Sequence, residues 1–592
     1  MLETIVPGVV LLGVALVVPW LSKRAGHAFG AAATGAITVW AGLIPAGTYY
    51  QIQFLGFEAV LLHVDTVSRL MGLIFGFIGT IAVGYSWASD ADVRQTAFAL
   101  TYVATSVGAV FAGDWLTMLF FWELMAITST LLVWDYGGRA IRAGFRYALL
   151  HGIGGSLFMA AIVAHYVEAG TFLFAAVPGG PETAGLVAGL PAALGAVGIG
   201  VNVGFVGLHT WLPDTYPRPH LAASVFLCVY TTKTGVYGMY RVFPEGNIAI
   251  AYMGGVMAVF GASMALLQND MRRLLSYHIQ SQVGYMVAGV GIPAALASAG
   301  AFAHVFNHIL YKSLLFMAAG VIIYRTGREN LKKLGGLGRE MPLTAIAFTI
   351  AALSIAGFPG FNGFVSKGMV MTAAHYEHMD TLWWLLVLGG VGTFLSFIKF
   401  GYYAFLHGEY DGLVADANRG QTIAMFVVAG LCVLFGIYPD ALYAILPLGG
   451  QWEAHPYTLG HIGEGLALAT AGVVGFALLK SPLEKVGGNV PDVDALYNPV
   501  VFYGTRKLVV TVTETYAAVD RLVVRAAEGT TWAARHPEEL ALRIGTALPA
   551  GTVHSRWQGD QPPARRFLRA SIGTGVFVLS LVIAFGLVLV SL

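Results

Sequence analysis

The sequence predicts an all-α, polytopic membrane protein with about sixteen transmembrane helices. Of its 592 residues, 57% are hydrophobic and only 11% are charged, whereas a soluble protein carries about 25% charged residues. The apolar residues form runs long enough to cross about 30 Å of hydrocarbon. The formal net charge of +1 gives no excess of positive charge that would attract nucleic acid. The two cysteines lie inside apolar runs, which excludes a disulfide framework and a cysteine-ligated metal site.

The first apolar run lacks the basic leader of a secretory signal, so we interpret it as a membrane helix. Each later run is separated from the next by a polar or glycine- and proline-containing loop. The predicted spans are 4–22, 28–50, 64–87, 96–112, 114–134, 144–168, 184–209, 219–242, 248–268, 274–297, 299–324, 341–375, 382–406, 421–447, 459–479 and 570–591.

The basic residues predict the orientation of these spans. They lie mainly in the loops that follow odd-numbered spans and in the polar stretch 480–569. Because basic loops stay in the cytoplasm, we expect the N-terminus outside, residues 480–569 inside, and a bacterial-type plasma membrane as the location. The loop residues that carry this pattern include Arg139, Arg142, Arg146, Arg272, Arg273, Arg325, Lys332 and Lys333.

Two helices are interrupted, five spans apart. The span at 184–209 runs into three prolines between Pro213 and Pro219, and the span at 341–375 contains the segment 357–364, which is rich in glycine. Interrupted helices in matching places suggest a transporter built from two inverted five-helix repeats, although both residue types are also common in ordinary membrane helices. The predicted organisation is N-terminal helices 1–95, first half-channel 96–242, second half-channel 248–406, C-terminal core helices 421–479, a polar amphipathic segment 480–569 and a terminal helix 570–592.

A few ionisable residues fall inside predicted spans. They are Glu123, Lys233, Lys312, Lys367 and Lys399. A charge at the centre of a bilayer costs roughly 2.5–3.5 kcal/mol even on the mildest scale, so intramembrane charges are functional candidates. Threonines beside Lys233 and the helix break beside Lys367 could solvate these two lysines. Lys399 lies near a helix end, where an extended side chain reaching the interface is an alternative to function.

Three further candidates share one helix. A spacing of four places His304, His308 and Lys312 on one face, as a proton relay requires. Buried structural histidines are the alternative. A zinc pair is disfavoured because no third ligand lies nearby, and we expect neither a metal nor a cofactor.

His209 and His151 are weaker candidates for the ion path. Asp65 and Asp114 begin spans, and we expect them to cap helix N-termini.

Six segments match motifs of one family. They are Phe121-Trp122-Glu123-Leu124, Leu208–Asp214, Gln268–Tyr277, Ser281–Tyr285, the His304–Lys312 face, and Gly357–Pro359 with Gly363–Lys367. Together, over about residues 60–440, they resemble the antiporter-like membrane subunits shared by Mrp-type Na+/H+ antiporters (their D-type and A-type members) and respiratory complex I (its L-, M- and N-type members).

The resemblance implies a core of fourteen helices in two inverted repeats, with a lateral segment and a final helix in the largest members. It implies that Glu123 is the glutamate of the first half-channel and Lys233 the connecting lysine. It also implies that His304, His308 and Lys312 form the central relay and that Lys367 is the terminal ionisable residue. Residues 499–545 could form the lateral segment, although Gly529 and Pro537 predict that it is not one clean helix.

One residue departs from the family pattern. Nine residues before Trp211 the family usually carries a lysine that pairs with the glutamate, and this sequence has Asn202. An asparagine cannot be charged, so our hypothesis is that Glu123 communicates instead with Lys233, directly or through water.

The resemblance favours proton or Na+/H+ translocation as a subunit of an Mrp-type antiporter, acting only within a larger complex of membrane subunits. The alternatives are a proton-pumping subunit of a complex I-type NADH-quinone oxidoreductase or membrane-bound hydrogenase, and a membrane partner in energy-coupled inorganic-carbon uptake. A metalloenzyme using His304 and His308 and a structural scaffold are alternatives of other classes. The sequence has no redox or hydrolytic site, so we expect no catalytic residue of that kind on this chain.

Overall fold

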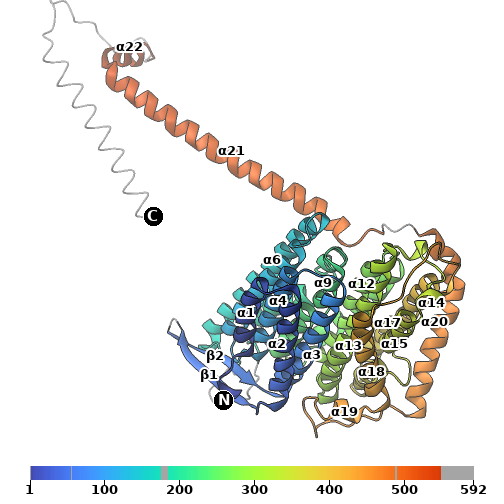
Figure 1. Cartoon of the computed structure of the whole chain (residues 1–592). Helices are drawn as coiled ribbons and strands as arrows, with labels where there is room; N and C mark the ends of the chain where they lie inside the picture. The colour runs from blue at the N-terminus through green and yellow to red at the C-terminus, as the bar shows by residue number, and fades with distance from the viewer. Residues whose placement is uncertain (1, 55, 175–184, 487–489, 548–592) are drawn as a thin grey trace, which may run out of the picture. The chain divides into compact units, whose positions relative to one another are not determined.

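The computed structural model describes residues 2–54, 56–174, 185–486 and 490–547. The chain divides into two compact units, Met1–Val493 and Asp494–Leu592. The first unit is a bundle of helices that run alongside one another, with one hairpin (Figure 1). The structure therefore confirms the predicted helical architecture. The predicted terminal span 570–591 lies outside the described residues.

The N-terminal part differs from the prediction by a β-hairpin. The second predicted span reached residue 50, but its helix ends at Leu43, and an antiparallel pair of strands follows in register from Gly47↔Val64 to Phe54↔Phe57. Pro45 and Gly47 prevent the helix from continuing, and the aromatic and β-branched residues that follow favour a strand. The elements are η1 (Leu2–Thr4), α1 (Pro7–Val17), η2 (Val18–Trp20), α2 (Lys23–Leu43), β1 (Gly47–Phe54), β2 (Phe57–Val64) and α3 (Thr66–Ala88).

Helices of the predicted first half-channel follow, and two aspartates cap helices as predicted. Asp65 accepts a hydrogen bond from the Ser68 amide at 2.7 Å at the start of α3, and Asp114 accepts one from the Thr117 amide at 2.8 Å at the start of α5. The elements are α4 (Val93–Phe111), α5 (Trp115–Trp134), α6 (Arg139–Ala169), α7 (Leu190–Val203), α8 (Trp211–Thr215), α9 (Leu221–Leu227) and α10 (Tyr230–Val242).

The predicted span 219–242 is not one helix. It divides at Cys228 and Val229 into α9 and α10. The Cys228 carbonyl accepts a hydrogen bond from the Lys233 ammonium at 2.6 Å, so a side chain takes the place of the missing backbone donor. Nothing in the hydrophobicity pattern signalled this division.

The predicted second half-channel contains the other expected interruption. The predicted span 341–375 separates into α15 and α16 at Gly357–Phe361, where Gly357 has φ +84 and ends α15. The elements are α11 (Ile248–Leu266), α12 (Met271–Gly291), α13 (Ala295–Thr326), η3 (Leu331–Lys333), α14 (Leu337–Glu340), α15 (Pro342–Ala356), α16 (Asn362–Tyr376), α17 (Asp380–Gly401) and the short π-helix η4 (Tyr402–Leu406).

The C-terminal core consists of α18 (Arg419–Ile437), α19 (Asp440–Tyr443) and α20 (Leu459–Lys485), so the predicted span 421–447 ends earlier than expected, at Ile437. The second unit contains α21 (Asp494–Arg535) and α22 (Pro537–Ala547). The expected interruption at Gly529 is wrong because α21 continues through it. A single glycine costs a helix only about 1 kcal/mol. Pro537 does begin a new helix, α22.

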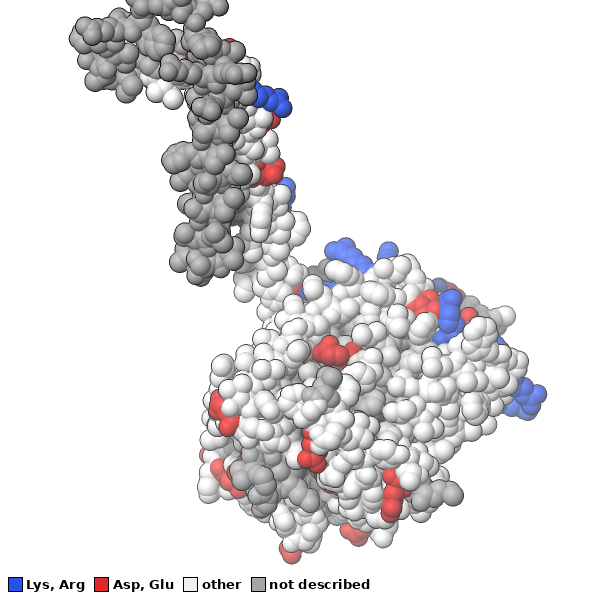
Figure 2. Space-filling view, turned by 90° about the vertical axis from the view of Figure 1, so that its left-hand side faces the viewer, with Lys and Arg blue, Asp and Glu red and all other residues white. Residues whose placement is uncertain are grey.

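Eight of the described helices are long and apolar enough to cross a membrane, judged by length and composition. Others are shorter apolar helices, such as α7 and α15. α13 is central: 94% of its most apolar stretch is buried, and it packs against α3, α9, α12, α15, α16 and α18. Most of the surface of the first unit in Figure 2 is uncharged, with basic side chains mainly in its upper part and acidic ones scattered toward its lower end.

Candidate functional site

The three predicted relay residues lie on α13 and are fully buried. The His304 ring has partners on both nitrogens: Nδ1 lies 2.9 Å from Ser366 Oγ, and Nε2 lies 3.3 Å from the Tyr311 hydroxyl. The His304 and His308 ring centroids are 6.3 Å apart. Within the described part of the chain, neither nitrogen of His308 nor the Lys312 ammonium has a hydrogen-bond partner.

Lys367 projects from α16 immediately after the second helix break. Its ammonium donates a hydrogen bond to the Ile355 carbonyl at 2.7 Å and lies 4.8 Å from the centroid of the Tyr285 ring. Ile355 belongs to the last turn of α15, where carbonyls lack helical partners. The break therefore solvates this lysine, and its neighbour Ser366 contacts His304.

Lys233 is held at the division between α9 and α10. In addition to the Cys228 carbonyl, its ammonium donates to Thr232 Oγ1 at 2.9 Å. Lys312 lies within electrostatic range of both Lys233 and Lys367. The structure thus brings together buried side chains from α10, α13 and α16, a set that we call the polar axis: Lys233, Lys312, His308, His304 and Lys367.

A second set of polar side chains adjoins Lys233, and the sequence analysis missed it. The Thr231 hydroxyl lies 2.5 Å from the Tyr102 hydroxyl and 3.0 Å from that of Tyr147, which in turn lies 2.9 Å from Ser129 Oγ. All four residues are buried and come from four helices. The only sequence signal was the presence of hydroxyls in apolar helices.

His151 extends this set. Its ring stacks on Tyr147 with centroids 4.0 Å apart, and its Nδ1 lies 2.9 Å from the Tyr147 carbonyl oxygen. Its Nε2 has no hydrogen-bond partner among the described residues. His151 therefore lies at the edge of the hydroxyl set with one ring nitrogen, Nε2, still able to form a hydrogen bond.

Glu123 is partly buried and packs directly on α6. A Cβ added at Gly155 would lie 1.6 Å from Glu123 Oε1, so an alanine there would force this carboxylate to a new position. Gly155 follows His151 by one helical turn on the same face. Glu123 Oε1 has no hydrogen-bond partner in the part of the chain that the structure describes.

Asn202 is buried on α7 beside Gly235 of α10, and neither of its side-chain polar atoms has a partner among the described residues. No hydrogen bond or ion pair joins Glu123 to Lys233 there, because the Lys233 ammonium bonds to Cys228 and Thr232 instead. A direct contact between Glu123 and Lys233 is therefore unsupported. A connection between them through water stays a proposal.

Lys399 is 1% exposed and does not extend to the surface. Its ammonium donates to the Leu266 carbonyl at 2.8 Å, the Gln268 carbonyl at 2.7 Å and Asn269 Oδ1 at 3.2 Å. These acceptors lie at and beyond the C-terminal end of α11, so Lys399 stabilises a helix end.

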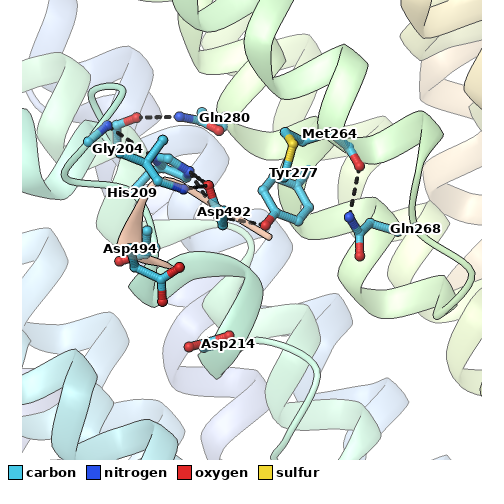
Figure 3. A network of polar contacts seen from close by, with 12 residues as sticks. Gly204, His209, Asp214, Met264, Gln268, Tyr277, Gln280, Asp492 and Asp494 are labelled. Carbon is cyan, nitrogen blue, oxygen red and sulfur yellow. Dashed lines mark hydrogen bonds and ion pairs between the residues drawn. The ribbon is translucent and has the colours of Figure 1, made fainter. Parts of the chain in front are cut away.

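His209 lies between α7 and α8 and is fully buried. Its Nε2 lies 3.2 Å from both carboxylate oxygens of Asp492, which precedes α21 (Figure 3). Sequence reasoning could not have paired two residues so far apart in the chain. The described residues contain no group of three or more His, Cys, Asp or Glu that could hold a metal ion.

Comparisons with known proteins agree with the family resemblance of the sequence motifs. Residues 112–396 match the family described as NADH:quinone oxidoreductase/Mrp antiporter, transmembrane. The D-type subunit of the Na(+)/H(+) antiporter of Alkalihalophilus pseudofirmus is 30% identical over 402 residues, which are 65% of this chain and 81% of that protein. The L-type subunit of the F(420)H(2) dehydrogenase of Methanosarcina mazei is 30% identical over 431 residues, 63% of each chain.

Solved structures show the same fold. A chain of the membrane-bound sulfane sulfur reductase, an archaeal respiratory membrane complex, superposes with a TM-score of 0.68 at 28% identity, over 83% of this chain and 86% of that one. A chain of the Mrp complex from Dietzia sp. gives 0.75 at 24% identity, over 93% and 64%. The protein therefore belongs to the NADH:quinone oxidoreductase/Mrp antiporter family of membrane subunits.

Proposed function

We propose that this protein translocates protons, alone or in exchange for Na+, as an antiporter-like subunit of a multisubunit Mrp-type cation/proton antiporter. The polar axis is the observation that carries the proposal. It gathers five ionisable side chains in the buried interior, and two of them, His308 and Lys312, lack hydrogen-bond partners among the described residues.

Buried polar atoms without partners are rare in folded proteins, and each requires an explanation. A group that exchanges protons with its neighbours or with internal water must leave a position open for the incoming proton. An imidazole can donate at one nitrogen and accept at the other, which suits His304 and His308 to a relay. Glu123 and His151 would extend the path through the first half-channel, and the polar set around Tyr147 would link them to Lys233.

The two helix breaks support the proposed division into inverted repeats at 96–242 and 248–406. α7 and α15 each begin with a proline in the first turn and end at a glycine with positive φ, Gly204 at +78 and Gly357 at +84. A phenylalanine follows each glycine, and its amide bonds back to the last turn, Phe205 to the Gly200 carbonyl at 2.8 Å and Phe358 to the Leu353 carbonyl at 3.0 Å.

The proposed orientation has the N-terminus outside and residues 480–569 on the cytoplasmic side of a bacterial-type plasma membrane. The uneven distribution of basic and acidic side chains over the first unit supports it (Figure 2). We assign residues 1–95 and 421–479 to flanking core helices, 480–569 to a lateral segment and 570–592 to a last span. The 42-residue helix α21, none of whose residues is buried, supports the assignment of a lateral segment.

A complex I-type assembly is the second candidate for the parent complex. It is favoured by the sulfane sulfur reductase chain, which matches over 86% of its own length, and by the relative from F(420)H(2) dehydrogenase. Purification of the native complex separates the two candidates: iron–sulfur subunits identify the respiratory type, and small hydrophobic subunits without redox centres identify the Mrp type.

The function is tested by ion flux through the assembled complex in vesicles, with a pH-sensitive dye and varied Na+. We expect Glu123→Gln and Lys312→Ala to reduce proton flux strongly, because each removes an ionisable group that the path requires. Lys333→Ala, which removes an exposed lysine, is the matched control and should transport normally. Normal flux in both pathway variants would show that the chain is a scaffold.

A further inference from the structure

A second set of polar side chains on α12 borders the polar axis. His278, Gln282 and Tyr285 are spaced by four and three residues, so they share one face of that helix, and all three are buried. The Lys367 ammonium lies 4.8 Å from the centroid of the Tyr285 ring. Tyr285 therefore places this face of α12 against the polar axis, and His278 lies two turns away on the same face.

His278 brings a further ionisable side chain close to Lys312. The centroid of the His278 ring lies 4.8 Å from that of Phe397 on α17, and the Lys312 ammonium lies 6.0 Å from the centroid of the same Phe397 ring. His278 also lies within electrostatic range of both Lys312 and Lys367. The group of buried ionisable side chains therefore includes one residue of α12.

Both ring nitrogens of His278 are buried without a hydrogen-bond partner among the described residues. A neutral imidazole carries one N–H and one lone pair, so it can accept a proton at one nitrogen and release one from the other. Buried polar atoms in folded proteins bond to protein groups or to internal water. Packing against Phe397 does not explain two buried nitrogens without a bond, whereas exchange of protons with internal water does.

The charges of His278 and Lys312 oppose each other. Two like charges in a buried interior repel strongly, so a single proton shared between the two groups is the stable arrangement. When the proton moves, an N–H bond breaks on the Lys312 ammonium and one forms on the imidazole, with internal water carrying the proton between them. The reverse transfer reloads Lys312 from His278.

A buried cluster of phenylalanines adjoins His278. Phe397 packs against Phe348 of α15 with ring centroids 6.4 Å apart, and Phe348 lies 4.6 Å from Phe400 and 5.2 Å from Phe405. All four side chains are at most 7% exposed. Phe400 belongs to the last turn of α17 and Phe405 to η4, which the proposed orientation places at the cytoplasmic end of the bundle. We call these four residues the phenylalanine plug.

We propose that His278 is the group through which the polar axis exchanges protons with the cytoplasm, and that the phenylalanine plug is the barrier between His278 and the cytoplasm. This inference rests on the proposed function, which makes Lys312 part of a proton path. Phenylalanine rings offer neither a donor nor an acceptor to a proton in transit. Protons therefore reach His278 only when the plug moves and admits water.

Proton flux through the assembled complex in vesicles tests the role of His278, with Lys312→Ala measured beside it. His278→Phe should lower the flux at least about tenfold, because the ring that remains cannot take up a proton. Ser281→Ala is the matched control. Ser281 is buried on the same helix, but its hydroxyl donates to the Ala258 carbonyl of α11 at 2.9 Å, so its loss should leave the flux near the wild-type value.

Normal flux in His278→Phe overturns the inference, and so does an equal loss in Ser281→Ala. Lys312→Ala then shows whether the proposed function fails as well: a blocked Lys312→Ala complex leaves that function standing, and a normal one refutes both. If His278→Phe does not assemble, His278→Gln makes the same test, because an amide keeps a polar side chain but cannot carry the proton.

Cysteine labelling tests the plug without any transport. His278→Cys, alone and combined with Phe397→Ala, is treated with a membrane-impermeant thiol reagent in sealed vesicles of either orientation. We expect labelling only in the combined variant and only from the cytoplasmic side. The Phe397→Ala chain gives the background, since its two native cysteines are buried. Ser281→Cys combined with Phe397→Ala is the control and should stay unlabelled.

Labelling of the combined variant from the outside, or no labelling from either side, overturns the assignment of His278 and the plug to the cytoplasmic end. Equal labelling with and without Phe397→Ala shows that the plug is not a barrier and overturns that part of the inference. The labelling pattern can be read in a complex that moves no ions, so failure of this inference is distinguished from failure of the proposed function.

Discussion

Replacing Lys312 with methionine should abolish ion flux and at the same time stabilise the protein. The side chain is fully buried, and its ammonium has no hydrogen-bond partner among the described residues. A charged lysine at the centre of a membrane costs roughly 2.5–3.5 kcal/mol on the mildest scale. Lys312 also lies within electrostatic range of Lys233 and Lys367, whose charges repel it. Methionine fills similar space without the charge, so we expect a gain in unfolding free energy of about 1–3 kcal/mol.

Lys399 is the matched control, with the opposite expectation. Its ammonium satisfies three oxygens at the end of α11. Lys399→Met leaves these buried acceptors without a donor, which costs about 1–3 kcal/mol for each group that water cannot reach. We therefore expect Lys399→Met to lower stability and to keep the flux per assembled complex near the wild-type value.

Both quantities are measured on the same preparations. Unfolding of the purified complex in detergent, followed by tryptophan fluorescence against denaturant, gives the stability of each variant, and reconstituted vesicles give the flux. The reasoning is refuted if Lys312→Met destabilises the protein as much as Lys399→Met, or if it transports at the wild-type rate.

Three further predictions concern the first half-channel. Gly155→Ala should displace Glu123, because the new Cβ would lie 1.6 Å from Oε1, and should reduce proton flux in vesicles; an unaffected flux would remove Glu123 from the path. Lys233→Ala should block transport and leave the Cys228 carbonyl unsatisfied, with lower stability, whereas full transport would contradict the proposed link between Glu123 and Lys233. Asn202→Lys places a second cation beside α10, and it should change the pH or Na+ dependence of transport; identical dependence would show that Asn202 does not set the coupling.

Local sequence chemistry predicted the features that depend on short stretches of chain. Asp65 and Asp114 precede apolar helices and cap them, and the glycine-rich segment 357–364 ends a helix where expected. The helix predicted over 184–209 is shorter than expected: α7 ends at Val203, before the prolines at 213–219, and Pro213 lies inside α8. The relay residues on α13 follow from a spacing of four. Threonine beside Lys233 and the break beside Lys367 predicted the groups that solvate these lysines.

Contacts between distant segments could not be predicted in this way. The Cys228 carbonyl that receives Lys233 exists only because α9 and α10 separate within an apolar stretch whose pattern predicts one helix. The hydroxyl set around Tyr147 needs four helices to meet. Asp492 lies in a polar segment that the sequence assigns to the cytoplasm, and only the fold brings it to His209.

The most direct test of the proposed path is proton flux through His308→Phe. Both nitrogens of His308 lack partners in the described residues, so this replacement breaks no hydrogen bond seen there and keeps a ring of similar size in the core. If the polar axis carries protons, an imposed pH gradient should drive a flux at least about tenfold lower than in the wild type, with the complex fully assembled. Wild-type flux through an intact His308→Phe complex would contradict the proposed path.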